Sequence, residues 1–235
     1  MLPISFNHSR RVESIAGVAL AVLAAASRVD AQIAFRQVNA AVPQTPQITV
    51  TVPFTAAQTA GNLNVVAIGW STPTVQVIGV TDTTGNTYSV AAGPTVQAGV
   101  QAQVMYVAPN IVGVGANVNN VSVTFSGAAA FPDVRIAEYS GLATTSPVAG
   151  GAGAVGRSTT SNSGPINVTA TNALLIGANY VSSRTTKPGT NYTTRVITSP
   201  DADILEDRIV TAAGNYSATA SLSSGNWVMQ IVTFK

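Results

Sequence analysis

The chain alternates short runs rich in valine, isoleucine, threonine and aromatic residues with turn signals made of glycine, proline and asparagine. The first group suits a pleated sheet, and the second marks turns. No stretch keeps a 3.6-residue apolar period, so we expect no long helix. Many short strands at this spacing are typical of a β-sandwich or barrel. The expected strands cover residues 47–52, 63–70, 75–80, 87–91, 100–107, 119–125, 134–139, 166–170, 173–181, 192–197, 204–211, 216–222 and 227–234.

We therefore predict an all-β chain, folded as a single two-sheet antiparallel β-sandwich of jelly-roll type. An internal duplication is a second hypothesis, because residues 62–70 resemble residues 172–180 at a shift of 110, and the turn before Tyr88 resembles the turn before Tyr192. The alternative to a duplication is that secreted β-sandwiches in general share this pattern of strands and turns. Residues 149–164, rich in Gly and Ala and then in Ser, Thr and Asn, read as a long exposed loop between the halves. We expect no domain linker there, since neither half alone is expected to have enough strands for two sheets.

The first 31 residues have the pattern of a signal peptide. Arg10 and Arg11 precede an apolar run over residues 15–26, and small residues flank the expected cut before Gln32. An uncleaved anchor is the alternative, but about a dozen apolar residues fall short of the roughly 20 that span a bilayer. We expect a secreted or cell-surface protein without a membrane span after cleavage. Residues 32–46 are expected to form an N-terminal arm or an edge strand, and residues 47–235 the sandwich.

Composition narrows the chemistry open to the mature chain. His8 is the only histidine and lies in the predicted signal peptide, and the chain has no cysteine. This excludes Ser-His-Asp and Cys-His catalysis and zinc sites built from histidine or cysteine. Residues 32–235 hold eight scattered bases against seven acids, whereas nucleic-acid binders cluster their bases. We expect no cofactor and no nucleic-acid partner, and we favour a non-catalytic protein.

Carboxylate chemistry is the remaining enzymatic possibility. Glycoside hydrolysis needs two carboxyl groups about 5–10 Å apart, and Glu138 and Glu206 are weak catalytic candidates within expected strands. Strand alternation places Glu138 on an apolar face, where an acid must be paired or carry a shifted pKa. An ion pair with Arg208 is the simpler interpretation, so we assign no catalytic residue.

Asp201 and Asp203 are weak candidates for a calcium site in a loop after Pro200. Calcium takes 6–8 oxygen ligands, usually gathered from several segments. Two acids alone are better explained as a solvated loop, and we assign no metal ligand.

Four residues that accompany turns are candidates for ligand contact: Asn86, Tyr88, Asn191 and Tyr192. Their position makes exposure plausible, and exposed tyrosines can stack against sugar rings. Trp70 and Trp227 share strand faces with aliphatic residues, so we expect both in the core.

Three segments together resemble a loosely defined group of β-sandwich modules. They are Val80-Thr81-Asp82-Thr83-Thr84-Gly85-Asn86-Thr87-Tyr88, Ala137-Glu138-Tyr139-Ser140-Gly141 and Ser146-Pro147-Val148. Such modules occur in secreted and surface proteins of bacteria, and some phage structural proteins carry similar ones. The resemblance spans most of the mature chain and implies location and fold. An aspartate often follows the Pro-Val pair in such modules, whereas this chain has Ala149.

The leading functional hypothesis is a secreted non-catalytic binding or structural module that contacts glycans or a cell-surface component. The alternative is a carboxylate-dependent polysaccharide hydrolase or lyase. A third possibility is an extracellular filament or matrix subunit that self-assembles when residues 32–46 add to a neighbour's sheet edge.

Overall fold

The computed structural model describes residues 1–4 and 32–235, and residues 32–235 belong to one compact unit. The predicted signal peptide, apart from its first four residues, lies outside the described part. The described residues form sixteen strands joined by turns, and every strand pairing is antiparallel. The predicted all-β sandwich class is therefore confirmed. Within the described residues, no helix meets the length and hydropathy needed to cross a membrane.

The first half of the compact unit builds two sheets. The first inner sheet has the strand order β1-β8-β3-β6-β5, with β1 Ala34–Ala41, β8 Asp133–Ser140, β3 Leu63–Trp70, β6 Gln101–Ala108 and β5 Ser89–Gln97. The first outer sheet has the order β2-β7-β4, with β2 Gln47–Pro53, β7 Asn120–Ala129 and β4 Val77–Asp82.

The second half builds a large sheet and a small ribbon. The second inner sheet has the order β12-β16-β11-β14-β13, with β9 also paired to β16; these are β12 Thr185–Lys187, β16 Thr219–Phe234, β11 Ala173–Val181, β14 Ile204–Val210, β13 Thr193–Ile197 and β9 Val148–Asn162. The second outer ribbon pairs β10 (Ile166–Val168) with β15 (Gly214–Tyr216).

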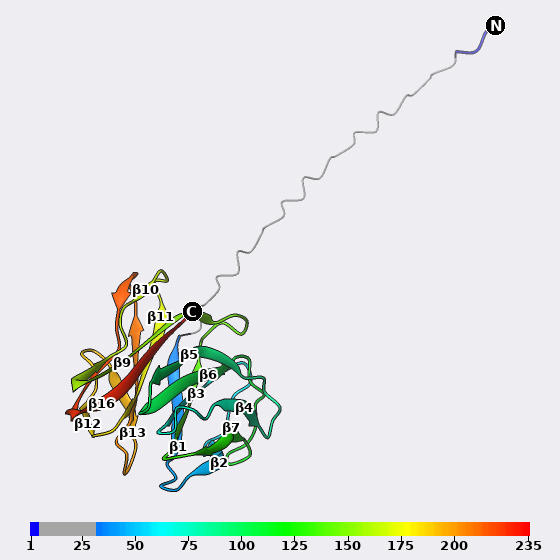
Figure 1. Ribbon diagram of the computed structural model, residues 1–235. Helices are drawn as coiled ribbons and strands as arrows, with labels where there is room; N and C mark the ends of the chain where they lie inside the picture. Colours follow the sequence, from blue (N-terminus) through cyan, green and yellow to red (C-terminus); the bar gives the residue numbers. More distant parts are fainter. Residues whose placement is uncertain (5–31) are drawn as a thin grey trace. The chain divides into compact units, whose positions relative to one another are not determined.

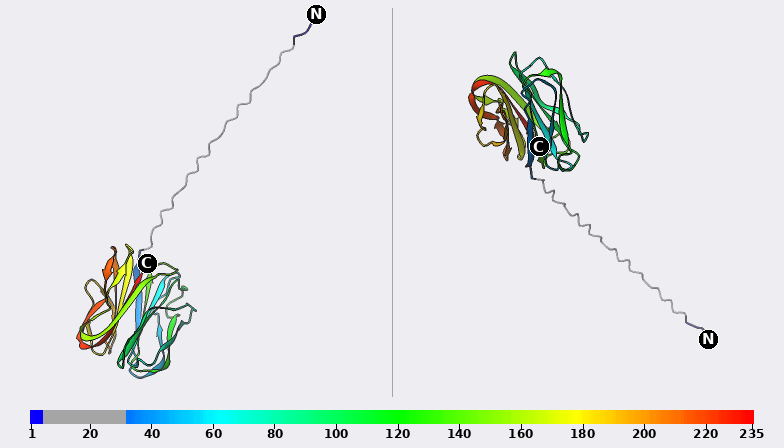
Figure 2. Two further views of the ribbon diagram at one scale, coloured as in Figure 1. Left: turned by 45° about the horizontal axis from the view of Figure 1, so that its top comes forward. Right: turned by 90° about the horizontal axis from the view of Figure 1, so that it is seen from below.

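Three apolar clusters fill the spaces between these layers. One lies between the first inner and outer sheets and includes Val66, Ile68 and Val123. A second lies between the two inner sheets and includes Val65 and Ile176. The third lies on the far face of the second inner sheet. Both inner sheets are thus covered on both faces, which explains why every residue of β3 and β11 is buried. Figures 1 and 2 show the two halves side by side.

The strand order repeats between the halves. Adding eight to each strand number turns β1-β8-β3-β6-β5 into β9-β16-β11-β14-β13, which is the pairing path of the second inner sheet. Aligning the two halves of the sequence at a shift of 110 nevertheless does not match structurally equivalent positions. It equates Val65, which faces the other half, with Leu175, which faces the outer side of its own half. A duplication stays a hypothesis, with the repeated strand order as its support.

Several sequence-based expectations are corrected. The fold has four sheets rather than two, because each half supplies eight strands. Residues 149–164, expected as a loop, contribute most of β9, which pairs with β16 along nearly its whole length. Gly225 and Asn226, which fall between the expected strands 216–222 and 227–234, lie inside β16 at an irregularity in the register. Of the two alternatives for residues 32–46, the structure has an edge strand, β1, paired with β8 of its own chain.

The β9 strand depends on glycine for its close packing. A Cβ on Gly153 would lie 2.3 Å from Thr95 Oγ1 of β5, and one on Gly156 would lie 2.4 Å from the indole of Trp227. Without side chains at these positions, β9 packs directly against its neighbours in both halves. The Gly/Ala composition that suggested a loop is therefore a packing requirement.

Candidate ligand-binding groove and buried acids

An apolar groove of about 260 Å³ opens on one side of the first half. It lies between β4 and β5, which are the edge strands of the outer and inner sheets. No lining residue carries a charge: they are Trp70, Pro73, Val75, Gln76, Val77, Val90, Pro94, Val96, Val104 and Tyr106. Val90 and Val96 are 50% and 47% exposed, so the groove brings aliphatic side chains to the surface.

The groove walls follow from the local sequence. The Trp70 indole N–H donates to the carbonyls of Thr72 and Val75, at 3.0 Å each, which ties the β3–β4 connection to the end of β3. The Trp70 ring packs edge-on against Phe125, with 5.7 Å between ring centroids. On the opposite wall, the β5–β6 register shifts between Ala92 and Thr95. This irregular stretch of β5 includes Pro94, which lines the groove.

A second, wider depression of about 660 Å³ is lined by Arg36, Asn62 and Ser140, together with Gln32, Ala34, Ala60, Gly61, Gly141, Leu142 and Thr144. The Arg36 Nε–H donates to Ser140 Oγ at 2.9 Å. This depression is more polar than the groove, and its one charged lining residue is a base. Its guanidinium already has a partner in the chain.

Asn86 and Tyr88, expected as ligand contacts, belong to a polar network around Asp82. Asp82 Oδ2 accepts hydrogen bonds from Asn86 Nδ2 at 2.7 Å, from the Tyr88 hydroxyl at 3.0 Å and from Asn119 Nδ2 at 3.0 Å. Burial raises the pKa of Asp82, but these donors outweigh it and the net pKa is lowered. Tyr88 and Asn86 therefore brace the β4–β5 turn from inside.

Asn191 and Tyr192 differ in their exposure to solvent. Asn191 is exposed and adopts a left-handed backbone conformation at φ 66°, which asparagine tolerates better than most residues. Tyr192 is 7% exposed and lies in the outer cluster of the second half. The expectation that Tyr192 is exposed is wrong, because its ring is needed to fill that cluster. Trp70 and Trp227 are buried as expected.

Glu138 is buried and held by neutral donors. Its Oε2 accepts from Gln37 Nε2 at 2.7 Å, and its Oε1 accepts from Asn62 Nδ2 at 2.5 Å and from the Thr59 amide at 3.2 Å. The expected ion pair with Arg208 is wrong. The Arg208 guanidinium instead lies over the ring of Tyr216 in the second half, 5.1 Å from its centroid.

Glu206 lies in the other half, fully buried. Its Oε2 accepts the Gly189 amide at 2.8 Å, while Oε1 has no hydrogen-bond partner. Burial raises the pKa of Glu206 to about 8, assisted by the negative charge of Asp207 and opposed by the Gly189 hydrogen bond. Glu138 and Glu206 share no hydrogen-bond partner, and neither lines the two depressions described above.

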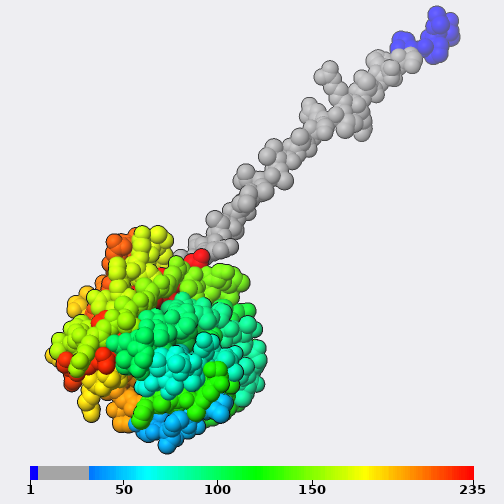
Figure 3. Space-filling view, viewed as in Figure 1, coloured from blue at the N-terminus to red at the C-terminus, as the bar shows by residue number. Residues whose placement is uncertain are grey.

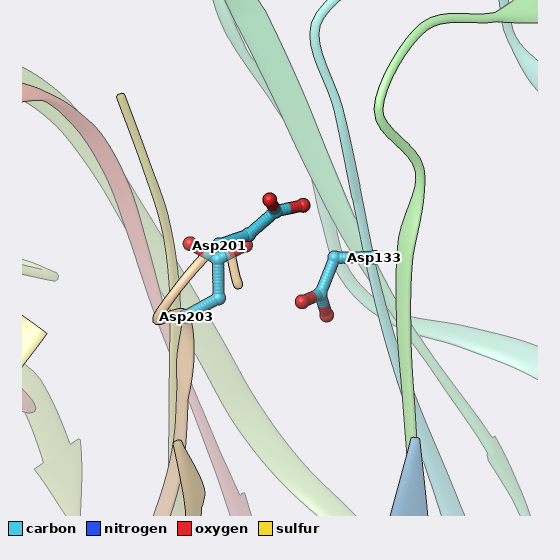
Figure 4. A group of neighbouring side chains, drawn as sticks. All are labelled: Asp133, Asp201 and Asp203. Carbon is cyan, nitrogen blue, oxygen red and sulfur yellow. The ribbon is translucent and has the colours of Figure 1, made fainter. Parts of the chain in front are cut away.

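Asp201 and Asp203 converge on a third acid, Asp133. One carboxylate oxygen from each lies within 4.8 Å of the others, and Figure 4 shows Asp133 reaching across from the first half toward the two acids of the β13–β14 loop. Burial and the charge of Asp133 raise the pKa of Asp203 well above its usual range. We call Asp133, Asp201 and Asp203 the seam acids, because they join the two halves.

Arg135 lies beside the seam acids and is fully buried. Its Nη1 donates to the carbonyls of Asn179 and Ile204 at 2.6 Å each, and its Nη2 donates to Gln103 Oε1 at 3.2 Å. The first two acceptors are on β11 and at the start of β14, whereas Arg135 is on β8. The guanidinium therefore bridges the two inner sheets.

The sequence interpretation did not single out Asp133, Arg135 or Tyr106. A signal existed for Arg135, because strand alternation within β8 puts it on the same face as Asp133, two positions earlier. No sequence signal predicted that Asp133 and Asp203 lie close together, because they are separated by 70 positions and come from different halves.

Comparison with known proteins adds no relative. No protein-family model, curated protein or solved structure matches the chain. Functional inference therefore depends on the residues and their geometry.

Proposed function

We propose that the chain is a secreted, non-catalytic binding module, and that the groove between β4 and β5 is its ligand site. The observation that carries the proposal is the lining: an open concavity of about 260 Å³ with aliphatic and aromatic walls and no charged residue. Ligand sites are typically concave, mostly apolar and supplied with a few polar groups. Here the polar groups are the exposed Gln76 amide and the half-buried Tyr106 hydroxyl.

The chemistry of the lining defines the ligand class. An uncharged groove favours a neutral ligand, since a charged group would lose hydration without gaining a partner. Drug-sized ligands occupy pockets of roughly 300–1,000 Å³, so this groove fits one ring or one end of a longer molecule. A neutral glycan meets these conditions, with the C–H face of a sugar ring on Tyr106 and hydroxyl groups toward Gln76.

The rest of the surface is also consistent with a binding role. The C-terminal part of β9, which crosses the face seen in Figure 3, exposes the uncharged polar residues Ser158, Thr159, Thr160 and Asn162. The filament hypothesis requires residues 32–46 to leave the first inner sheet, where β1 makes seven paired positions with β8. Self-assembly therefore has a structural cost that ligand binding at the groove does not.

The proposal is tested with residues 32–235 on an array of neutral and charged glycans. Val96→Asp places a charge in the groove, and Val118→Asp makes the same change at a site outside it that is 51% exposed. We expect binding of neutral glycans that Val96→Asp abolishes and Val118→Asp leaves intact. A blank array at high protein concentration contradicts the glycan assignment, and equal binding by both variants contradicts the groove.

A further inference from the structure

We propose that the seam acids, Asp133, Asp201 and Asp203, form a binding site for one divalent cation, with calcium as the preferred ion. This site is separate from the groove and does not depend on the proposed function. It would fasten the two halves of the compact unit together.

The spacing of the acids matches calcium. The chosen oxygens lie within 4.8 Å of one another. Calcium–oxygen distances are 2.3–2.6 Å, so two ligands on one ion are at most roughly 5 Å apart. Magnesium demands a near-ideal octahedron and gives up its water reluctantly, so it is usually held by one or two carboxylates and not by a largely buried set of three.

The second observation is a set of buried oxygens without hydrogen-bond partners. Asp203 is fully buried, and its Oδ1 accepts the Val181 amide at 2.7 Å while its Oδ2 accepts nothing. Asp201 Oδ2 is also buried without a partner, although Asp201 Oδ1 accepts from Gln44 Nε2 at 3.0 Å. Buried polar atoms in proteins are nearly always satisfied. These two oxygens therefore have free lone pairs within the cluster.

The charges around the site favour a divalent ion. Binding of an ion requires all three carboxylates to be ionised. They then carry three negative charges, and the facing base is Arg135, whose Nε lies 2.6 Å from Asp133 Oδ1. The other neighbours with hydrogen bonds to the cluster are neutral: Thr198, the Val181 amide and Gln44. A net charge of two negative units remains in a buried place, where uncompensated charge is costly. One divalent cation neutralises it.

An ion and its remaining water ligands can reach the seam acids from the side of Asp201. Asp201 is only half-buried, whereas the other two acids are fully buried. Calcium takes 6–8 oxygens, so water entering beside Asp201 would complete the coordination. Carboxylates from two distant segments then hold the ion, in agreement with the way calcium sites usually gather their ligands.

The test measures calcium binding to the whole chain by titration calorimetry and by thermal unfolding in calcium, magnesium or EDTA. The variant is Asp201→Asn, because Asp201 is the least buried ligand. The control is Gln44→Ala, which removes an exposed neighbour of Asp201 and no carboxylate. We expect one calcium per chain and a Tm rise of roughly 3–6 °C at about ten times the Kd, in the wild type and in Gln44→Ala.

The same experiment can overturn the proposal. Asp201→Asn is expected to keep the wild-type Tm in EDTA and to lose at least tenfold in calcium affinity. No calorimetric binding to the wild type at millimolar calcium contradicts the site. An equal calcium response in Asp201→Asn, or a magnesium response as large as that to calcium, also contradicts it.

Discussion

Arg135 Nε lies 2.6 Å from Asp133 Oδ1, and both side chains are fully buried between the two inner sheets. The contact is an ion pair that is not aligned as a hydrogen bond. The remaining nitrogens of Arg135 are occupied by Asn179, Ile204 and Gln103. One side chain therefore connects strands from both halves and neutralises one acid at the seam.

Replacing Arg135 with methionine is expected to destabilise the chain by about 3–5 kcal/mol, because it leaves Asp133 buried and without its opposite charge. Chemical denaturation measures the change. The control is Arg157→Met, since Arg157 is exposed on β9, and its effect should stay within about 0.5 kcal/mol. Similar small effects for both variants would show that Arg135 does not hold the seam.

Replacing Glu138 with glutamine is expected to destabilise by about 1–3 kcal/mol. The carboxylate accepts from Gln37, Asn62 and the Thr59 amide, so an introduced NH2 group meets donors and leaves at least one of them unpaired. The measurement is again denaturation in urea. A Glu138→Gln protein as stable as the wild type would contradict the assigned hydrogen bonds.

Glu206 predicts a loss of stability at alkaline pH. Its pKa is about 8 in the folded state against an ordinary value of 4.5, so the folded state binds the proton more tightly. The stability from this group is complete below pH 4.5, falls as the pH rises, and is lost above pH 8. Glu206→Gln should remove a drop of a few kcal/mol between pH 5 and pH 9. An unchanged slope in the variant would show that Glu206 ionises normally.

Two glycines test the packing of β9. Gly153→Ala introduces a Cβ 2.3 Å from Thr95 Oγ1, whereas Gly79→Ala, on edge strand β4, introduces one with no atom within 4 Å. We expect Gly153→Ala to lower the free energy of unfolding by about 1–3 kcal/mol and Gly79→Ala to have little effect. Equal Tm values for the two variants would contradict the close approach of β9 to β5.

The sequence predicts strands better than it predicts layers. The bounds expected for β3 and β11 agree with the structure, because each is a mainly apolar run, interrupted by Asn64 or Asn179, between turn signals. The β9 strand was missed, since glycine and alanine have low strand propensity and its pairing depends on β16, about 70 positions away. The local sequence pattern also could not show that other layers pack against both faces of each inner sheet.

The surroundings of the candidate residues depend on tertiary packing, which the sequence does not show. Tyr88 follows a turn that suggested exposure, but its hydroxyl hydrogen-bonds Asp82 within the fold. Asp203 was a weak calcium candidate with Asp201 alone, and the third acid came from a strand in the other half. The groove arises from two sheet edges that the sequence does not pair. Most of its residues are valines and prolines, which carry no distinctive sequence signal.

The most direct test of the central claim is the comparison of Val96→Asp with Val118→Asp in glycan binding, with Tm measured for both. The account predicts folded variants of similar Tm, with neutral-glycan binding at least tenfold weaker for Val96→Asp and unchanged for Val118→Asp. Equal affinities for the two variants, or no glycan bound by the wild type, would contradict it.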